Sequence, residues 1–123
     1  GTANKFIYTK DKQIQGVIIA PGINIAIKSL AGNTALLHEV ELKAPVKYLG
    51  NNTIQCIQSG VIHGTATMIE GMVGRIKEEV KEDFDIIITG GLSKMMIDLI
   101  RLDMVRDSRL VLKGLLSIYY KNI

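Results

Sequence analysis

The feature that most constrains the fold is a long segment, residues 53–81, in which apolar side chains recur at helical spacing. At about 100° per residue they fall on one broad arc: Ile54, Ile57, Val61, Met68, Ile69, Met72, Val73, Ile76 and Val80. Asn51-Asn52-Thr53 stands where such a helix would begin, and these side chains commonly cap helix N-termini. We therefore predict one long helix whose apolar arc the rest of the fold must cover.

Four glycines lie on this predicted helix and project within about 80° of one another: Gly60, Gly64, Gly71 and Gly74. Each helical glycine costs about 1 kcal/mol relative to alanine, so the stripe needs a compensating contact. A neighbouring helix or sheet of the same domain, a helix of a second subunit, or a ligand could each supply it. The sequence leaves these three alternatives open.

The segment before the long helix predicts a hairpin and two short helices. Residues 4–9 and 14–20 are strand-like and flank a polar turn at 10–13, which is typical of a β-hairpin. Pro21-Gly22 ends the second strand. Apolar spacing then predicts helices over 23–30 and 34–38, followed by an extended piece over 46–49.

Residues 84–89 (Phe-Asp-Ile-Ile-Ile-Thr) form an apolar run too continuous for a one-sided strand, and they predict a central one. After Gly90-Gly91 we expect a helix over 92–102, a loop over 103–108 and, within 110–119, a closing helix preceded by an extended entry. The order of strands and helices indicates an α/β or α+β layered fold, not a bundle. We expect residues 1–123 to form a single domain.

Composition places the chain in a broad class. Its 123 residues match one ordinary domain, which buries about two-thirds of the unfolded surface. The lone Cys56 indicates a reducing compartment and, by itself, a small buried hydrophobe. No signal peptide or apolar stretch of membrane-spanning length is present, so a cytoplasmic location without a membrane partner is expected. The net charge of +3 comes from scattered basic residues, so no nucleic-acid partner is expected.

Two short motifs could contact a ligand. Thr89-Gly90-Gly91, between a predicted strand and a predicted helix, could turn tightly and admit a flat or phosphorylated ligand near unpaired N–H groups. A ligand-free turn would look the same. Gly1-Thr2-Ala3 could likewise bring a hydroxyl to a phosphate. His38 and His63 lack partners at ligand spacing, so no metal site is expected within the chain.

Read in order, the landmarks resemble the type III pantothenate kinase family of the actin, sugar-kinase and heat-shock ATPase superfamily. They run along almost the whole chain: Gly1-Thr2-Ala3, Gly16, Ile19-Ala20-Pro21-Gly22, Thr34-Ala35-Leu36-Leu37, Gly50-Asn51-Asn52-Thr53, Ser59-Gly60, Gly64, Thr89-Gly90-Gly91, and a tail with Leu110, Leu112, Gly114, Leu115, Ile118, Tyr119 and Asn122. Each landmark is common alone, whereas the ordered set is specific.

The resemblance implies a fold and a reaction. The fold would be a ribonuclease-H-like, actin-like ATPase half-domain with a mixed sheet that starts with the hairpin and is flanked by helices. The reaction would be ATP-dependent phosphorylation of pantothenate, the first step of coenzyme A biosynthesis. ATP with Mg²⁺, a monovalent cation (K⁺ or NH₄⁺) and a homodimer formed through the long helix would accompany it.

The resemblance also implies roles for particular residues. Gly1, Thr2, Ala3, Thr89, Gly90 and Gly91 would contact the nucleotide, and Thr53 would contact pantothenate. The family's general base and its cation-binding aspartate lie upstream of Gly1. The chain is thus expected to be the C-terminal half of a two-domain kinase, with no catalytic residue of its own and no activity alone.

Three parts of the sequence depart from the family pattern. Asn4-Lys5-Phe6-Ile7 stands where Thr-Thr-x-Asp is usual, Val17 replaces a glycine, and Leu37-His38 replaces Leu-Pro. Asn4-Lys5 and Ile7 favour an alternative, a diverged, non-catalytic relative that acts as a regulatory or accessory protein, whereas the intact Thr89-Gly90-Gly91 and Thr53 oppose it. A third alternative, another superfamily member with a different small substrate, fits the fold but not the Asn52-Thr53 and tail landmarks.

Overall fold

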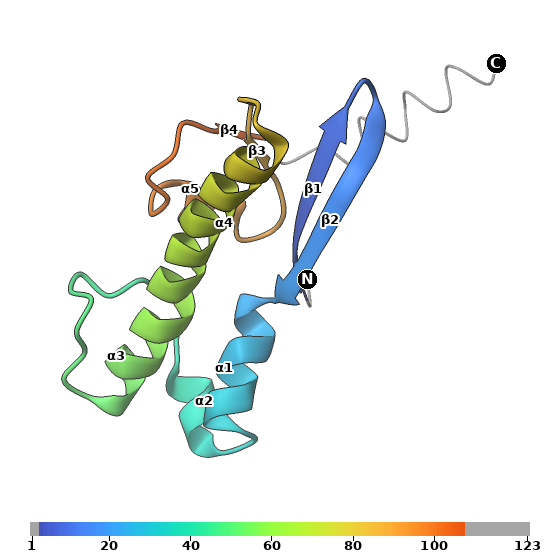
Figure 1. Cartoon of the computed structure of the whole chain (residues 1–123). Coiled ribbons are helices and arrows are strands. Elements are labelled where there is room, and N and C mark those ends of the chain that lie inside the picture. The colour runs from blue at the N-terminus through green and yellow to red at the C-terminus, as the bar shows by residue number, and fades with distance from the viewer. Residues whose placement is uncertain (1–2, 108–123) are drawn as a thin grey trace. The chain divides into compact units, whose positions relative to one another are not determined.

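The computed structural model describes residues 3–107 (Figure 1). The chain divides into two compact units, Gly1–Thr65 and Ala66–Ile123, and each is described by itself. Gly1, Thr2 and the predicted closing helix over 110–119 lie outside the described residues.

The first unit opens with the predicted hairpin. Strands β1 (Ala3–Lys10) and β2 (Gln13–Pro21) pair antiparallel, from Ala3 opposite Pro21 to Lys10 opposite Gln13. Asp11 and Lys12 form a two-residue turn with φ of 54° and 64°. Positive φ at both central residues is the mirror-image geometry whose twist matches that of the strands, so the hairpin prediction is confirmed.

Two helices follow the hairpin, as predicted. Helix α1 (Ile23–Ala31) begins where the carbonyl of Gly22 accepts from the Ala26 amide, and it ends at Gly32, whose φ is 65°. Helix α2 (Ala35–Glu39) comes next. One face of α1 packs toward the start of the long helix, and the core of this unit consists of Ile23, Ile27, Ala31, Val40, Val61 and Ile62.

The long helix is confirmed, with one turn that the sequence did not predict. It consists of α3 (Thr53–Gln58), the π-helical turn η1 (Ser59–His63) and α4 (Gly64–Val80). The helix ends at Lys81, a left-handed residue with φ of 56° whose amide donates to the Lys77 carbonyl. A π-turn adds one residue to the helix. The apolar periodicity on either side is intact, so the pattern alone does not reveal it.

The turn changes how the glycines are arranged. Because η1 contains Gly60 and ends just before Gly64, a projection at constant angle does not carry across it. Gly64, Gly71 and Gly74 all lie on α4 and keep a shared side. Among the described residues, a Cβ added at any of the four would meet nothing within 4 Å. Close packing by another element of the described chain therefore does not explain the stripe.

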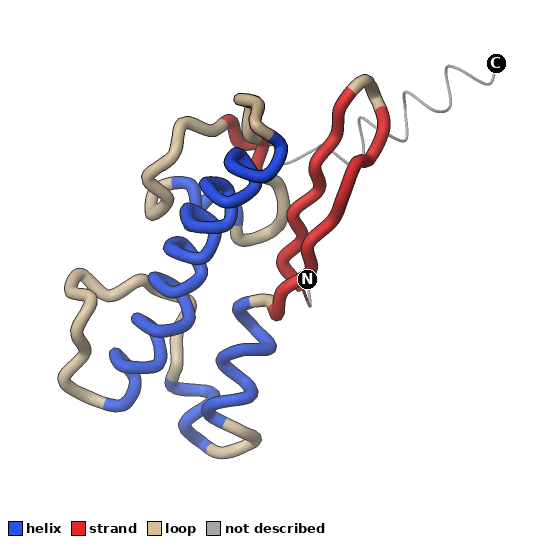
Figure 2. Tube along the Cα trace, viewed as in Figure 1, coloured by secondary structure: helices blue, strands red, loops and turns tan. Residues whose placement is uncertain are grey.

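The second unit has shorter elements than predicted. Strand β3 (Ile87–Ile88) pairs parallel with β4 (Val105–Arg106), and helix α5 (Ser93–Ile97) connects them. The predicted strand over 84–89 and helix over 92–102 are thus too long, and the predicted loop over 103–108 contains β4. Figure 2 shows the strands as two pairs, and within residues 3–107 the two sheets are separate.

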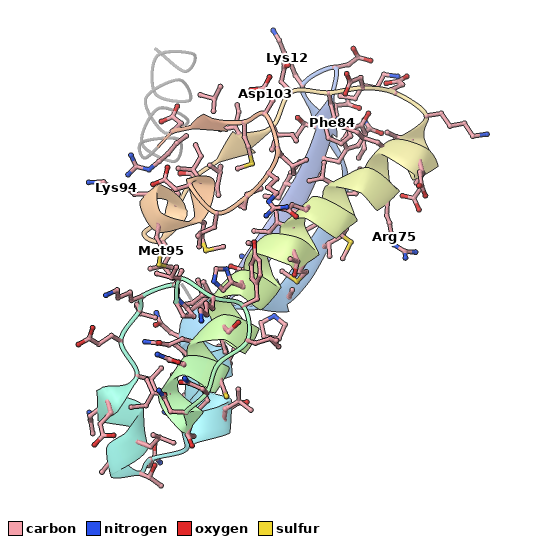
Figure 3. The ribbon with its side chains drawn as sticks, turned by 90° about the vertical axis from the view of Figure 1, so that its left-hand side faces the viewer. Lys12, Arg75, Phe84, Lys94, Met95 and Asp103 are labelled. Carbon is pink, nitrogen blue, oxygen red and sulfur yellow. The ribbon has the colours of Figure 1, made fainter. Side chains whose placement is uncertain are left out.

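The end of α4 is tied to the segment that follows it. Lys77 Nζ lies 3.0 Å from Asp83 Oδ1 and 5.4 Å from the Phe84 ring centroid, and the Phe84 amide donates to Asp83 Oδ1 at 3.0 Å. The Lys77 hydrogen bond, then the Phe84 amide, lower the pKa of Asp83. Figure 3 labels Phe84 beside the end of α4 and shows Arg75 projecting outward from that helix.

The described residues thus form a mixed α/β chain with a small hairpin and a long helix. Among these residues, no helix is long and apolar enough to span a membrane.

Candidate functional site

Thr53 is the first residue of α3 and is exposed. The preceding residue caps the helix: Asn52 Oδ1 accepts from the Gln55 amide at 2.9 Å. The Gln55 side chain reaches back to the Asn51 amide at 3.5 Å. Because Asn52 does the capping, the Thr53 hydroxyl is not required for it and stands at the surface.

Gly50 brings the chain close to this helix start. A Cβ at Gly50 would lie 2.6 Å from the amide nitrogen of Cys56 and 2.8 Å from the carbonyl carbon of Gln55. These are backbone atoms of the helix, which cannot move aside as a flexible side chain would. Only glycine fits at this position, so the approach to Thr53 is fixed by close backbone contact.

The residues that lead to Gly50, here called the 41–50 loop, are held by three side chains of the long helix. Gln58 Nε2 donates to the Glu41 carbonyl at 3.0 Å, and Ser59 Oγ donates to the Tyr48 carbonyl. His63 Nε2 lies 2.7 Å from the Pro45 carbonyl, which can only accept, so Nε2 carries the hydrogen. We call these three hydrogen bonds the clasp.

The Thr89-Gly90-Gly91 turn lies in the second unit. Gly90 has φ of 112°, which L side chains rarely adopt. Its carbonyl accepts from the Ser93 hydroxyl at 2.7 Å and from the Ser93 amide at 3.2 Å. Arg106 of β4 donates from Nε to the same Ser93 Oγ at 3.0 Å, and Ser93 is only 3% exposed. The buried Ser93 hydroxyl therefore fixes the carbonyl side of the turn.

The other side of this turn is open. Within residues 3–107, a Cβ added at Gly90 or Gly91 would meet nothing within 4 Å, so a ligand could approach the bare backbone. The helix that follows, α5, has five residues. The helix predicted over 92–102 is therefore too long, and few aligned peptide units contribute to the dipole at this junction.

The predicted site residues fall in different places. Ala3 starts β1 opposite Pro21 and Thr53 starts α3, both in the first unit, whereas Thr89, Gly90 and Gly91 share one turn of the second. Gly1 and Thr2 lie outside the described residues. Sequence reasoning missed the supporting side chains, Gln58, Ser59, His63, Ser93 and Arg106. The only signal for them was a polar residue beside a glycine turn or near a loop. The atom to which such a side chain hydrogen-bonds depends on the tertiary structure.

Among the residues that the structure describes, no group of three His, Cys, Asp or Glu side chains could hold a metal ion. Cys56 is exposed, not buried as the sequence suggested, because it faces away from the apolar arc of the helix.

Comparison with known proteins identifies the family of this chain. Residues 1–75 match the sequence profile of one family, described as type III pantothenate kinase. The chain belongs to this family. It is 68% identical over 123 residues to a type III pantothenate kinase of Acholeplasma laidlawii (strain PG-8A), a match that covers 100% of this chain and 50% of that protein. It is 36% identical over 123 residues to one of Bacillus cytotoxicus, covering 99% of this chain and 47% of that protein. The chain thus spans about half the length of the curated relatives it matches.

Proposed function

We propose that this chain is the C-terminal half of a type III pantothenate kinase, which phosphorylates pantothenate with ATP in the first step of coenzyme A biosynthesis. One observation carries the proposal: the whole chain aligns at 68% identity with half of a protein of that name. The mixed α/β architecture with its hairpin agrees with a ribonuclease-H-like, actin-like half-domain. On this proposal the chain lacks the general base and is inactive alone.

In this function the Thr89-Gly90-Gly91 turn would lie against the nucleotide, together with Gly1, Thr2 and Ala3. Its support is the open backbone at Gly90 and Gly91. Phosphoryl transfer depends mostly on positioning and on stabilising charge, and both can come from backbone groups held rigidly. The Ser93 hydroxyl supplies that rigidity at the Gly90 carbonyl. No proton transfer is assigned to the described residues.

Thr53 would bind pantothenate through its exposed hydroxyl at the start of α3. Pantothenate carries hydroxyl, amide and carboxylate groups, for which a threonine hydroxyl can donate or accept. In this function Mg²⁺ would enter bound to ATP. Mg²⁺ would neutralise phosphate charge during transfer. A K⁺ or NH₄⁺ ion would be held by a residue outside positions 1–123.

The proposal extends to assembly and location. A homodimer formed through the long helix would give Gly64, Gly71 and Gly74 a partner at the side of α4 that the described residues leave uncovered. A cytoplasmic location follows from the substrates, because ATP and coenzyme A synthesis are intracellular.

A non-catalytic regulatory relative remains the second candidate, favoured by Asn4, Lys5 and Ile7 where the family usually has Thr, Thr and Asp. In the structure the Asn4 side chain donates to the Pro21 carbonyl at 3.4 Å, so it stabilises the hairpin end. Lys5 and Ile7 are exposed.

A chimera tests the assignment. The chain would replace the matching half of the Acholeplasma laidlawii protein, and phosphopantothenate formation would be followed with ATP present. We expect turnover by the chimera, none by the 123-residue chain alone, and a raised pantothenate KM in the chimera with Thr53→Val. A folded chimera without turnover, beside an active parent, would reject the kinase and favour the regulator.

A further inference from the structure

The 41–50 loop is held to the long helix by three hydrogen bonds, while two of its apolar side chains lie in solvent. Val46 is 101% exposed and Leu49 is 90% exposed, so neither contributes burial energy. The loop contains no helix or strand, so its carbonyl groups need partners from elsewhere. The clasp provides three of them, at Glu41, Pro45 and Tyr48.

The clasp is built around the π-helical turn. Ser59 and His63 are the first and last residues of η1, and Gln58 directly precedes it. All three side chains donate to the same loop, and the Tyr48 and His63 rings meet edge to face at 4.8 Å between centroids. Single π-turns within α-helices are frequent at functional sites, where they redirect side chains. Here the turn coincides with the donors that grip the loop.

The loop leads directly to the exposed threonine. At its end, Gly50 abuts the backbone of Gln55 and Cys56, and only Asn51 and Asn52 separate it from Thr53. The helix therefore holds the loop at both ends: through the clasp at 41–48 and through backbone contact at Gly50. A shift of the loop would move the corner from which the Thr53 hydroxyl projects.

We infer that Ser59 and His63 are positioning residues for pantothenate, acting through the 41–50 loop on the Asn52-Thr53 corner. This inference rests on the proposed function. Because nucleotide contacts are assigned to other residues, loosening the clasp should affect the two substrates differently. In the chimera, His63→Ala should raise the KM for pantothenate about fivefold, the size of one lost hydrogen bond, and leave the KM for ATP unchanged.

Two further variants sharpen the kinetic test. His63→Gln retains a side-chain N–H donor, so its pantothenate KM should return close to that of the unmodified chimera. If His63 acted only through the packing of its ring, the pantothenate KM would stay raised in this variant. Val46→Ala is the matched control, since its side chain is fully exposed on the same loop. A uniform fall in kcat with no selective change in the pantothenate KM would overturn the inference.

Hydrogen exchange on the 123-residue chain tests the clasp without any turnover. His63→Ala should speed exchange of backbone amides over 41–54 relative to Val46→Ala, while those of α1 stay unchanged. Equal exchange over 41–54 in the two variants would overturn the clasp, whatever the chimera does. Faster exchange together with an inactive unmodified chimera would uphold the clasp but overturn both the kinase assignment and the pantothenate role.

Discussion

Arg106 donates from Nε to the hydroxyl of Ser93 at 3.0 Å, and that hydroxyl in turn donates to the Gly90 carbonyl at 2.7 Å. This short chain of hydrogen bonds links β4 to the turn between β3 and α5. Because the central Ser93 hydroxyl is buried, water has little access to it, and Arg106, thirteen positions away, helps to fix the Thr89-Gly90-Gly91 turn.

Ser93→Ala should destabilise the chain by about 1 kcal/mol, because it removes a buried hydroxyl that hydrogen-bonds both the Gly90 carbonyl and Arg106 Nε. Urea denaturation measures the change in unfolding free energy. Ser29→Ala, at an exposed position on α1, is the control and should change little. Equal stability of the two variants would show that the hydrogen-bond chain contributes nothing.

The two glycines of the turn should differ in their tolerance of a side chain. Gly90→Ala places a Cβ at a φ of 112° and should cost about 1–3 kcal/mol in unfolding free energy. Gly91→Ala meets open space at an ordinary φ, so it should be neutral or stabilise the chain slightly. Thermal melting of both variants without nucleotide makes the comparison, and an equal cost at both positions would contradict it.

Gly50→Ala should destabilise the first unit by about 1–3 kcal/mol, the usual cost of forcing atoms into a packed space. The added Cβ would lie 2.6 Å from the Cys56 nitrogen, so the loop must move away from the helix start. Gly16→Ala on β2 is the control, because a Cβ there meets nothing within 4 Å. Circular dichroism during denaturation would compare them, with similar losses counting against the close approach.

Asp83 should titrate below the ordinary range of an aspartate. The Lys77 hydrogen bond is the first cause, followed by the Phe84 amide, so Lys77→Gln should raise its pKa toward the ordinary value. A lowered folded-state pKa stabilises the fold above the unfolded pKa, and this contribution is lost as pH falls through the folded pKa. Carboxyl NMR titration measures the shift. Lys94→Gln is the control and should leave the Asp83 titration unchanged.

If the long helix forms the proposed homodimer, Gly64→Leu should give monomers in sedimentation, because a leucine would fill the close approach. Leucine favours a helix over glycine, so the fold itself should survive. Glu79→Leu, at an exposed position on α4, is the control and should keep the dimer. A dimer in the Gly64 variant would remove the stripe from the interface.

Local signals in the sequence were enough for the elements that local energetics determine. The polar turn at 10–13, the cap at Asn52 and the apolar arc of the long helix each depend on neighbouring residues, and each prediction is confirmed. The loop predicted over 103–108 contains the strand β4 instead. A two-residue strand carries no periodicity, because it depends on its pairing with β3.

The supporting contacts of the candidate site could not be predicted for a related reason. His63 donates to a carbonyl eighteen positions away, and any residue could have supplied that carbonyl. Likewise, the π-turn at Ser59–His63 leaves no mark in the apolar pattern, since it shifts the helix without changing which residues are apolar. Motifs singled out Thr53 and Gly90 as candidate site residues, but they could not indicate which side chains hold these positions in place.

Cys56 offers a direct way to observe the Asn52-Thr53 corner. It is the single thiol of the chain, it is exposed, and it follows Thr53 by three residues, so both side chains lie on neighbouring parts of the same helical face. A maleimide fluorophore would attach there and nowhere else. Its emission would then change with the local surroundings of Thr53, so that fluorescence would report the binding of a ligand beside that residue.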